Sequence, residues 1–541
     1  MPNLLATFWM PDTETMRLVL PEMVLIGTIV AVLVAAMLLG RDTRMIGTVS
    51  LVGALATAVA AALTMPPVAD GARELFGVIG PEGVGPGMLV ADPLSIFFRL
   101  FVAVFLAAII GMWFLFDAPR ERAAPEFHTL LLSSALGMMF MTSTVNLLMM
   151  IIAIELASMP SYALAGFDRF RRIAAESSVK YVLFGATTSG FMIFGASLLY
   201  GMFGTLHIPL LIERIAALDF SANLYLLPLL AVSLLAVFAG IGFKISAVPF
   251  HFWCPDVFEG ASLPVATWLS VASKAAGVVL LARIVYLFTG PDTLSYTEFV
   301  LPTLSYGIGF FAILTCTFAN LAAYRQTNVR RLLAYSSIAH AGYMLAACAI
   351  VARTDDGPVA AISALLQYLV VYMFMNLGAF MAVGLVAADT GNEDMKSFTG
   401  LGWRDPLTAA SLTVCLVSLI GLPPLGGFIA KWWLIYALGQ AAEAGHSNLL
   451  WTLVIVIVLN TAVSLFYYAR IIKEMYLRGS DHAGAALRAP VLGKAALHVC
   501  AVVLLLTGTL LVSRLKSVTD TAATFVYAGS AATVEVARQD P

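Results

Sequence analysis

Long runs of apolar residues separated by short polar stretches dominate this chain. A helix needs about 20 predominantly apolar residues to cross a bilayer, and runs of that length recur from end to end. They predict about fourteen helices, at residues 18–39, 45–65, 94–116, 127–144, 145–166, 178–203, 223–247, 261–288, 297–321, 331–352, 358–388, 406–438, 449–469 and 495–513. The pattern therefore predicts an all-α polytopic membrane protein.

The polar stretches are too short to fold as soluble domains. The longest are the loop 66–93, the loop 389–405 and the tail that begins at Ser517. The first apolar run, 18–39, lacks a small-residue cleavage site behind it, so we interpret it as a retained helix rather than a signal peptide.

Composition agrees with this picture, and the placement of charge adds an orientation. The 541 residues are 60% hydrophobic and 11% charged, with a mean hydropathy of +0.92, and the net charge of −2 does not indicate a nucleic-acid partner. Loops on one side of the predicted bundle carry 17 Lys and Arg, whereas the other side, with both termini, carries 7. The positive-inside rule therefore predicts both termini outside. The other six cations lie inside or at the ends of apolar runs: Arg99, Lys180, Lys244, Lys274, Arg283 and Lys431.

Lys244 and Lys274 are the first candidates for function, because they lie in segments that are apolar enough to span a lipid bilayer. A lysine near a bilayer centre costs roughly 2.5–3.5 kcal/mol on insertion scales, so one that persists usually faces the protein interior or a water-filled path. The alternative is a lysine at a helix end that extends its ammonium to the membrane surface.

Glu155 is the one carboxylate deep inside an apolar run, and Lys244 is its natural partner. Opposite charges about 4–6 Å apart favour both ionised forms, and separating them could drive the lysine to release its proton. This is the physics that a proton pump needs. A static structural ion pair is the competing interpretation.

Lys431 follows a segment, Gly421 to Gly427, that contains Pro423 and Pro424 and three glycines. These residues predict a broken helix, and non-helical backbone at membrane depth is tolerated only where protein or a water-filled cavity satisfies it. Pro249 suggests a similar interruption near Lys244. Two proline-interrupted spans in separate halves of a chain are typical of transport sites built from repeats, although each could also be a simple proline kink.

Three further residues are weaker candidates. Histidine ordinarily titrates near neutrality, which makes His251 and His340 candidates. His340 also shares its helix with a polar stripe at helical spacing, formed by Tyr335, Ser336, Ser337 and Tyr343. A packing histidine would show the same pattern. Lys180 lies one turn after Glu176, and a surface helix pair explains it equally well.

Redox chemistry is not expected in this chain. The five cysteines have no spacing suited to zinc, haem or an iron–sulfur cluster. The sequence also contains no Walker A motif, no dinucleotide-binding glycine fingerprint and no nucleophile elbow. Cofactors, if the function needs them, would belong to partner subunits.

Several motifs in order resemble a known family. They are Lys244-Ile-Ser-Ala-Val-Pro-Phe-His-Phe-Trp-Cys-Pro-Asp-Val-Phe-Glu-Gly260, Leu269-Ser-Val-Ala-Ser-Lys-Ala-Ala-Gly277, Asn328-Val-Arg-Arg-Leu-Leu-Ala-Tyr-Ser-Ser-Ile-Ala-His-Ala-Gly-Tyr343 and Met375-Asn-Leu-Gly-Ala-Phe380. They are similar to the antiporter-like membrane subunits of proton-pumping NADH:quinone oxidoreductase, respiratory complex I, and among these to subunit N. The resemblance covers roughly residues 18 to 480. It departs at Cys254, where Thr is usual, at Leu263, and at Arg330, where lysine is common.

The resemblance implies an architecture and roles. Helices 4–8 (127–288) and 9–13 (289–480) would form two inverted five-helix repeats with discontinuous helices 7 and 12, between helices 1–3 (1–126) and helix 14 with the tail (481–541). Glu155 and Lys244 would be the charge pair of one half-channel, Lys274 the connecting residue and Lys431 the terminal lysine. The chain itself would hold no cofactor.

The resemblance also implies partners and a location. NAD, FMN, iron–sulfur clusters and quinone would lie in partner subunits, and subunits M and K and lipids would be neighbours in a bacterial inner membrane. The alternatives are a subunit of an Mrp-type cation/proton antiporter or of a membrane-bound hydrogenase relative, and a membrane-arm scaffold whose lysines no longer conduct.

Overall fold

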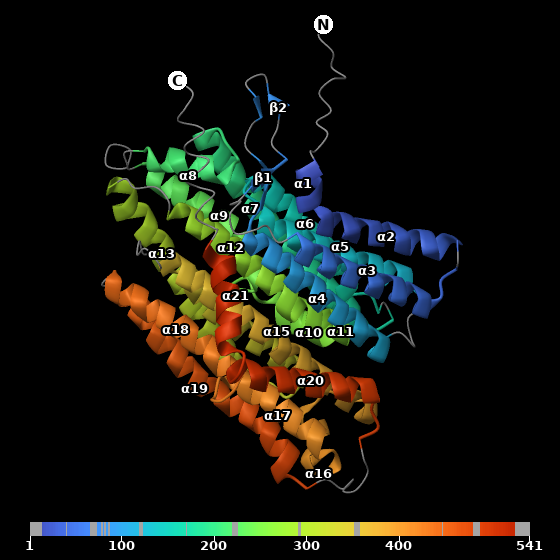
Figure 1. Ribbon diagram of the computed structural model, residues 1–541. Coiled ribbons are helices and arrows are strands. Elements are labelled where there is room, and N and C mark those ends of the chain that lie inside the picture. Colours follow the sequence, from blue (N-terminus) through green and yellow to red (C-terminus); the bar gives the residue numbers. More distant parts are fainter. Residues whose placement is uncertain are drawn as a thin grey trace.

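The computed structural model describes residues 13–38, 40–64, 73–76, 79–80, 83–84, 87–117, 123–168, 170–218, 225–289, 294–350, 357–445, 447–479 and 487–524. Both termini, most of the predicted tail from Ser517 and much of the predicted loop 66–93 lie outside these residues. Nearly all described elements are helices that pack side by side in one bundle (Figure 1). The predicted all-α membrane fold is therefore confirmed.

The helices and strands have the following bounds. The N-terminal part contains α1 Thr13–Leu18, α2 Leu20–Leu38, α3 Thr43–Leu63, β1 Arg73–Leu75, β2 Ile79–Gly80, β3 Gly83–Val84, β4 Leu89–Ala91 and α4 Pro93–Phe116. The middle contains α5 Ala124–Ser143, α6 Leu147–Ala165, α7 Arg172–Phe203, α8 Ile208–Ala216, α9 Leu226–Ile245, α10 Trp253–Gly260, α11 Leu263–Trp268, η1 Leu269–Ser273 and α12 Lys274–Phe288. The C-terminal part contains α13 Leu294–Ala323, α14 Val329–Cys348, α15 Gly357–Thr390, η2 Met395–Phe398, α16 Leu401–Arg404, α17 Pro406–Ile420, α18 Gly426–Ala444, α19 Asn448–Leu477, α20 Val491–Gly508 and α21 Val512–Thr524.

Eleven of the described helices are long and apolar enough to cross a membrane. This establishes a multi-pass protein, while the count of fourteen spans, the inverted repeats and the domain boundaries stay predictions. The predicted loop 66–93 also contains short strands, with β1 paired antiparallel to β4 and β2 to β3.

Glu74, on β1, fastens this strand pair to the bundle. Its carboxylate lies 3.3 Å from Nε2 of His207 and accepts a 2.8 Å hydrogen bond from the backbone N–H of Gly87. Burial alone would raise the pKa of Glu74, but the bonds with His207 and Gly87 outweigh burial and hold the pKa below its ordinary value.

Two helices break where the prolines predict an interruption. The first break separates α9 from α10, where Ser246 adopts a left-handed conformation three residues before Pro249. The second separates α17 from α18, where Gly421 has φ +88° and Pro423 and Pro424 follow. A left-handed residue ends a helix, and proline cannot donate the hydrogen bond that would continue it. Both predicted interruptions are confirmed.

A third irregularity was not predicted. Residues 269–273 form a π-helical turn, η1, between α11 and α12, and Lys274 is the first residue after it. Such turns often occur at functional sites because they change the direction in which the next side chains point.

Two of the six cations in apolar runs hold buried ion pairs away from the lysines. Arg99 on α4 lies 2.7 Å from Glu22 on α2. Arg283 on α12 makes two bonds, of 2.7 and 2.9 Å, with the carboxylate of Asp92 at the start of α4. We therefore assign both arginines to the packing of the bundle.

Candidate functional site

Lys244, in the last turn of α9, is fully buried. Its Nζ donates a 3.0 Å hydrogen bond to Oγ of Ser158 on α6. Glu155 lies one turn earlier on α6, and its carboxylate accepts a hydrogen bond from Ser189 on α7. Among the described residues Lys244 forms no ion pair, so the direct Glu155–Lys244 contact that we predicted is not made here. Ser158, three residues after Glu155 on the same helical face, occupies the position next to the ammonium, and the two charges interact only at longer range.

Lys274 is also fully buried and also bonded to neutral groups. Its Nζ lies 2.5 Å from Oγ of Ser337 on α14 and 3.5 Å from Sγ of Cys254 on α10. The ring of Phe258 lies 5.5 Å away, within range for a cation–π interaction. Cys254, the departure from the family pattern, therefore still offers a polar atom to this lysine.

Lys431, on α18, extends to the broken end of α17. Its Nζ donates to the carbonyl oxygens of Ile420, at 2.7 Å, and Leu419, at 3.2 Å, and lies 4.9 Å from the ring of Tyr343. A helix C-terminus carries unpaired carbonyls and a partial negative charge, which favour an ammonium. The helix break therefore supplies the carbonyl oxygens that hold the ammonium of Lys431.

Helix α14 links the second lysine to the third. Ser337, His340 and Tyr343 are spaced three residues apart and share one helical face. Ser337 contacts Lys274, and the ring of Tyr343 lies beside Lys431. His340 stands between them, with Nδ1 2.5 Å from the hydroxyl of Tyr368, and it interacts electrostatically with both lysines.

The other two weaker candidates, His251 and Lys180, lie in different environments. His251 is buried at the first helix break, with its ring 4.5 Å from that of Phe252 and 4.8 Å from that of Phe318. Lys180, by contrast, has a side chain that is 40% exposed, and it pairs with Glu176 at 2.8 Å and with Asp256 at 2.7 Å. The surface pair that the sequence allowed for Lys180 is present, and a second carboxylate from α10 joins it.

Sequence reasoning missed several polar partners. Ser158 and Tyr368 gave no signal, because each lies on a different helix from the group that it contacts. Ser337 was visible only as part of the α14 stripe. A further buried cluster joins Tyr343, Asn320, Asn460 and Tyr467 through hydrogen bonds of 2.9–3.0 Å between α13, α14 and α19.

The residues that the structure describes contain no group of three His, Cys, Asp or Glu side chains that could hold a metal ion. The five cysteines are buried and unpaired. The lysine, histidine and hydroxyl groups at this site can exchange protons along their hydrogen bonds.

Comparisons with known proteins agree on one family. Residues 144–460 match the family described as NADH:quinone oxidoreductase/Mrp antiporter, transmembrane. NADH-quinone oxidoreductase subunit N of Anaeromyxobacter sp. (strain Fw109-5) is 40% identical over 435 residues, which cover 79% of this chain and 80% of that protein.

Solved structures give the same result. A chain of respiratory complex I from Thermus thermophilus, solved with bound aureothin, is 29% identical with a TM-score of 0.71, over 92% of this chain and 98% of that one. A chain of the Mrp complex from Dietzia sp. DQ12-45-1b has a TM-score of 0.77 over 96% and 98% of the two chains, but at 20% identity it shows a shared fold alone.

Proposed function

This chain belongs to the NADH:quinone oxidoreductase/Mrp antiporter family of membrane subunits, as a relative of subunit N, and we propose that its buried lysines carry the protons. It is a proton-translocating membrane-arm subunit of respiratory complex I. The enzymatic activity belongs to the complex as a whole.

The observation that supports the lysine path is the same at each of the three sites. Lys244, Lys274 and Lys431 are buried, and their hydrogen bonds go to hydroxyl, thiol and carbonyl groups. None of them forms an ion pair in the part of the chain that the structure describes. A buried ammonium without a carboxylate partner gains little from staying charged, so it can pass its proton to a neighbour.

The proposed path follows the order of these residues. Protons enter from the side that carries the basic loops and pass Lys244, Lys274, His340 and Lys431. They leave on the other side when the interaction of Glu155 with Lys244 changes. His251 and Lys180 border the first half of the path, where His251 could bind a proton in transit and Lys180 holds Asp256 in place.

The remaining parts of the assignment concern the complex. NAD, FMN, iron–sulfur clusters and quinone bind in partner subunits, and other membrane-arm subunits are its neighbours, with subunits M and K adjacent. The chain lies in a bacterial inner membrane with both termini on the outer face. The charge difference between alternate loops supports this orientation.

Replacing Lys274 with methionine in the complex tests the path. Methionine keeps the length and apolar stem of lysine but cannot carry a proton. The NADH-driven proton uptake of inverted vesicles should fall for each electron transferred, while subunit assembly and the oxidation of NADH by a soluble acceptor are retained. Arg172→Met, which removes an exposed cation at the start of α7, serves as the control.

A scaffold without conduction makes the opposite prediction, namely an unchanged number of protons per electron in Lys274→Met. A separate measurement tests membership in complex I. The chain, tagged and purified in mild detergent, should bring flavin and iron–sulfur subunits that oxidise NADH. Purification with only other hydrophobic subunits, together with sodium–proton exchange in vesicles, would replace this assignment with the antiporter.

A further inference from the structure

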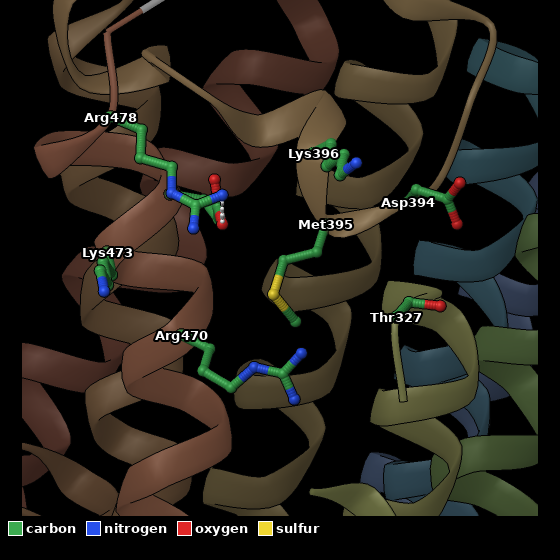
Figure 2. A pocket seen from close by; sticks show the side chains of 8 residues that line it. Thr327, Asp394, Met395, Lys396, Arg470, Lys473 and Arg478 are labelled. Atoms are coloured by element: carbon green, nitrogen blue, oxygen red, sulfur yellow. Dashed lines mark ion pairs between the residues drawn. The ribbon is translucent and has the colours of Figure 1, made fainter. Parts of the chain in front are cut away.

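A cavity of about 550 Å³ opens between the end of α19, the start of α14 and η2 (Figure 2). Backbone hydrogen bonds fix its floor: the N–H of Met395 donates to the carbonyl of Thr327 at 2.9 Å, and the N–H of Val329 donates to the carbonyl of Glu393 at 3.0 Å. Backbone bonds therefore hold together the two segments that carry Thr327 and Met395, both of which line the cavity.

The charge lining the cavity is unbalanced. Four cations line it, Lys396, Arg470, Lys473 and Arg478, against two carboxylates, Asp394 and Glu474. Asp394 accepts a 3.2 Å hydrogen bond from Asn392, and Glu474 is held by Arg478 at 2.8 Å and by Thr399 at 3.2 Å. Lys396, Arg470 and Lys473 form no ion pair among the described residues, so two positive charges are left over. Figure 2 shows the side chain of Arg470 extending across the cavity, away from the Arg478 pair. Arg470 donates one hydrogen bond, to the carbonyl oxygen of Tyr324, which carries no full charge. An anion is the ligand that these cations lack.

The face of α19 that bears Arg470 and Lys473 also carries large exposed apolar side chains. Ile455, Leu459 and Phe466 are 57–60% exposed, and they precede Arg470 and Lys473 at spacings of three, four and seven residues, which keep all five on one helical face. Exposed Leu321 lies one turn before Tyr324, at the end of the neighbouring α13. An exposed apolar surface thus leads directly to a basic cavity.

We propose that this cavity binds the phosphodiester headgroup of an anionic diacyl phospholipid, whose acyl chains lie along the exposed face of α19. The cavity lies on the side of the bundle with the basic loops, where cations at helix ends attract anionic headgroups. Free phosphate would satisfy the cations but would leave the apolar face unused, so the two features together select the lipid.

The test uses the intact complex in vesicles that contain phosphatidylglycerol with a photoactivatable acyl chain. Labelling should concentrate on peptides of α13 and α19. Lys396→Gln combined with Lys473→Gln, two exposed positions that leave the fold intact, should lower this labelling roughly tenfold, since each cation near an anionic headgroup contributes severalfold to binding.

The matched control is Arg171→Gln with Arg172→Gln, which removes two exposed cations from the same predicted side and should leave labelling unchanged. Three results would overturn the proposal: equal labelling by phosphatidylcholine, displacement of the label by excess inorganic phosphate, and crosslinking of the cavity to an acidic segment of a partner subunit in place of lipid. Equal labelling by phosphatidylcholine would show that the cavity does not select an anionic headgroup. Displacement by phosphate would show that it binds free anions, and the crosslink would show that it contacts a partner protein.

Discussion

At the scale of single residues, each of the three buried lysines is hydrogen-bonded to uncharged groups, but the groups differ from one lysine to the next. Lys244 uses a serine hydroxyl, Lys274 a serine and a thiol, and Lys431 the carbonyls of a helix end. A hydrogen bond to a charged group contributes about 1.5–3 kcal/mol, less than a buried carboxylate would. Each ammonium is therefore held in place without being locked into its charged form.

Ser158 is the residue that tests this environment at Lys244. Ser158→Ala removes the hydroxyl that accepts the hydrogen bond from Lys244. We expect proton uptake by inverted vesicles to slow about tenfold, in line with one lost bond to a charged group. Ser158→Thr, which keeps the hydroxyl, should retain most of the rate. Equal rates in the alanine and threonine variants would contradict this role.

Lys180 should behave differently, because its side chain is 40% exposed and is paired with Glu176 and Asp256. Exposed pairs contribute about 0–1 kcal/mol. Lys180→Gln should therefore leave the number of protons moved per electron unchanged in vesicles, with at most a small loss of rate. A loss as large as that of Lys274→Met would place Lys180 on the path itself.

At the scale of elements, the two helix breaks, rather than the continuous helices, supply hydrogen-bonding groups to the buried lysines. The break after α17 exposes the carbonyls that hold Lys431. The break after α9 is followed by α10, which places Sγ of Cys254 3.5 Å from Nζ of Lys274. A continuous helix would pair those carbonyls internally and would leave no acceptor for the ammonium. The two prolines and the left-handed glycine of the second break are therefore part of the Lys431 site.

Gly421 gives a direct test of this statement. It has φ +88°, and a Cβ at this position would lie 2.8 Å from Cδ of Lys431. Gly421→Ala should cost about 1–2 kcal/mol of stability from the left-handed backbone and should also displace Lys431, so that proton uptake falls while the complex still assembles.

Gly439→Ala is the matched control on α18, because the nearest atom to its added Cβ is 3.9 Å away. Gly439→Ala should change neither the stability of the complex nor its proton uptake. Normal proton uptake in Gly421→Ala would show that proton transfer does not need the contact between the helix break and Lys431.

At the scale of the whole molecule, a buried arginine pair ties N-terminal helix α4 to α12, the helix that begins at Lys274. Arg283 on α12, nine residues after Lys274, binds Asp92 at the start of α4 and donates a 2.8 Å bond to the carbonyl of Thr142 on α5. Two consecutive helices, α4 and α5, therefore meet the distant α12 at one guanidinium, which fixes how α12 sits in the bundle.

Arg283→Met tests the contribution of this ion pair to stability. The substitution leaves the carboxylate of Asp92 buried and unpaired, and breaking a buried pair costs about 3–5 kcal/mol. The melting temperature of the detergent-solubilised complex should fall clearly. Arg41→Met removes an exposed arginine whose partner, Glu126, is also exposed, and it should change the melting temperature little. Similar losses in both variants would show that burial is not the cause.

The sequence by itself determined the membrane class, the two helix breaks and the identity of the buried lysines. Each of these follows from local chemistry. Apolar runs of bilayer length must become helices, because lipid offers no partner to the backbone, and proline cannot continue a helix. A lysine inside such a run is conspicuous because its burial is costly.

Only the tertiary structure decided which groups surround each lysine. Ser158 is 86 residues from Lys244, and Ser337 is 63 residues from Lys274, so no local pattern relates them. The expected direct contact of Glu155 with Lys244 was not formed for the same reason: charge complementarity predicts attraction, but the rotation of α6 about its axis decides which side chain faces the ammonium. The π-helical turn before Lys274 likewise depends on how α11 and α12 pack between their neighbours, and packing of that kind leaves no periodic signal in the sequence.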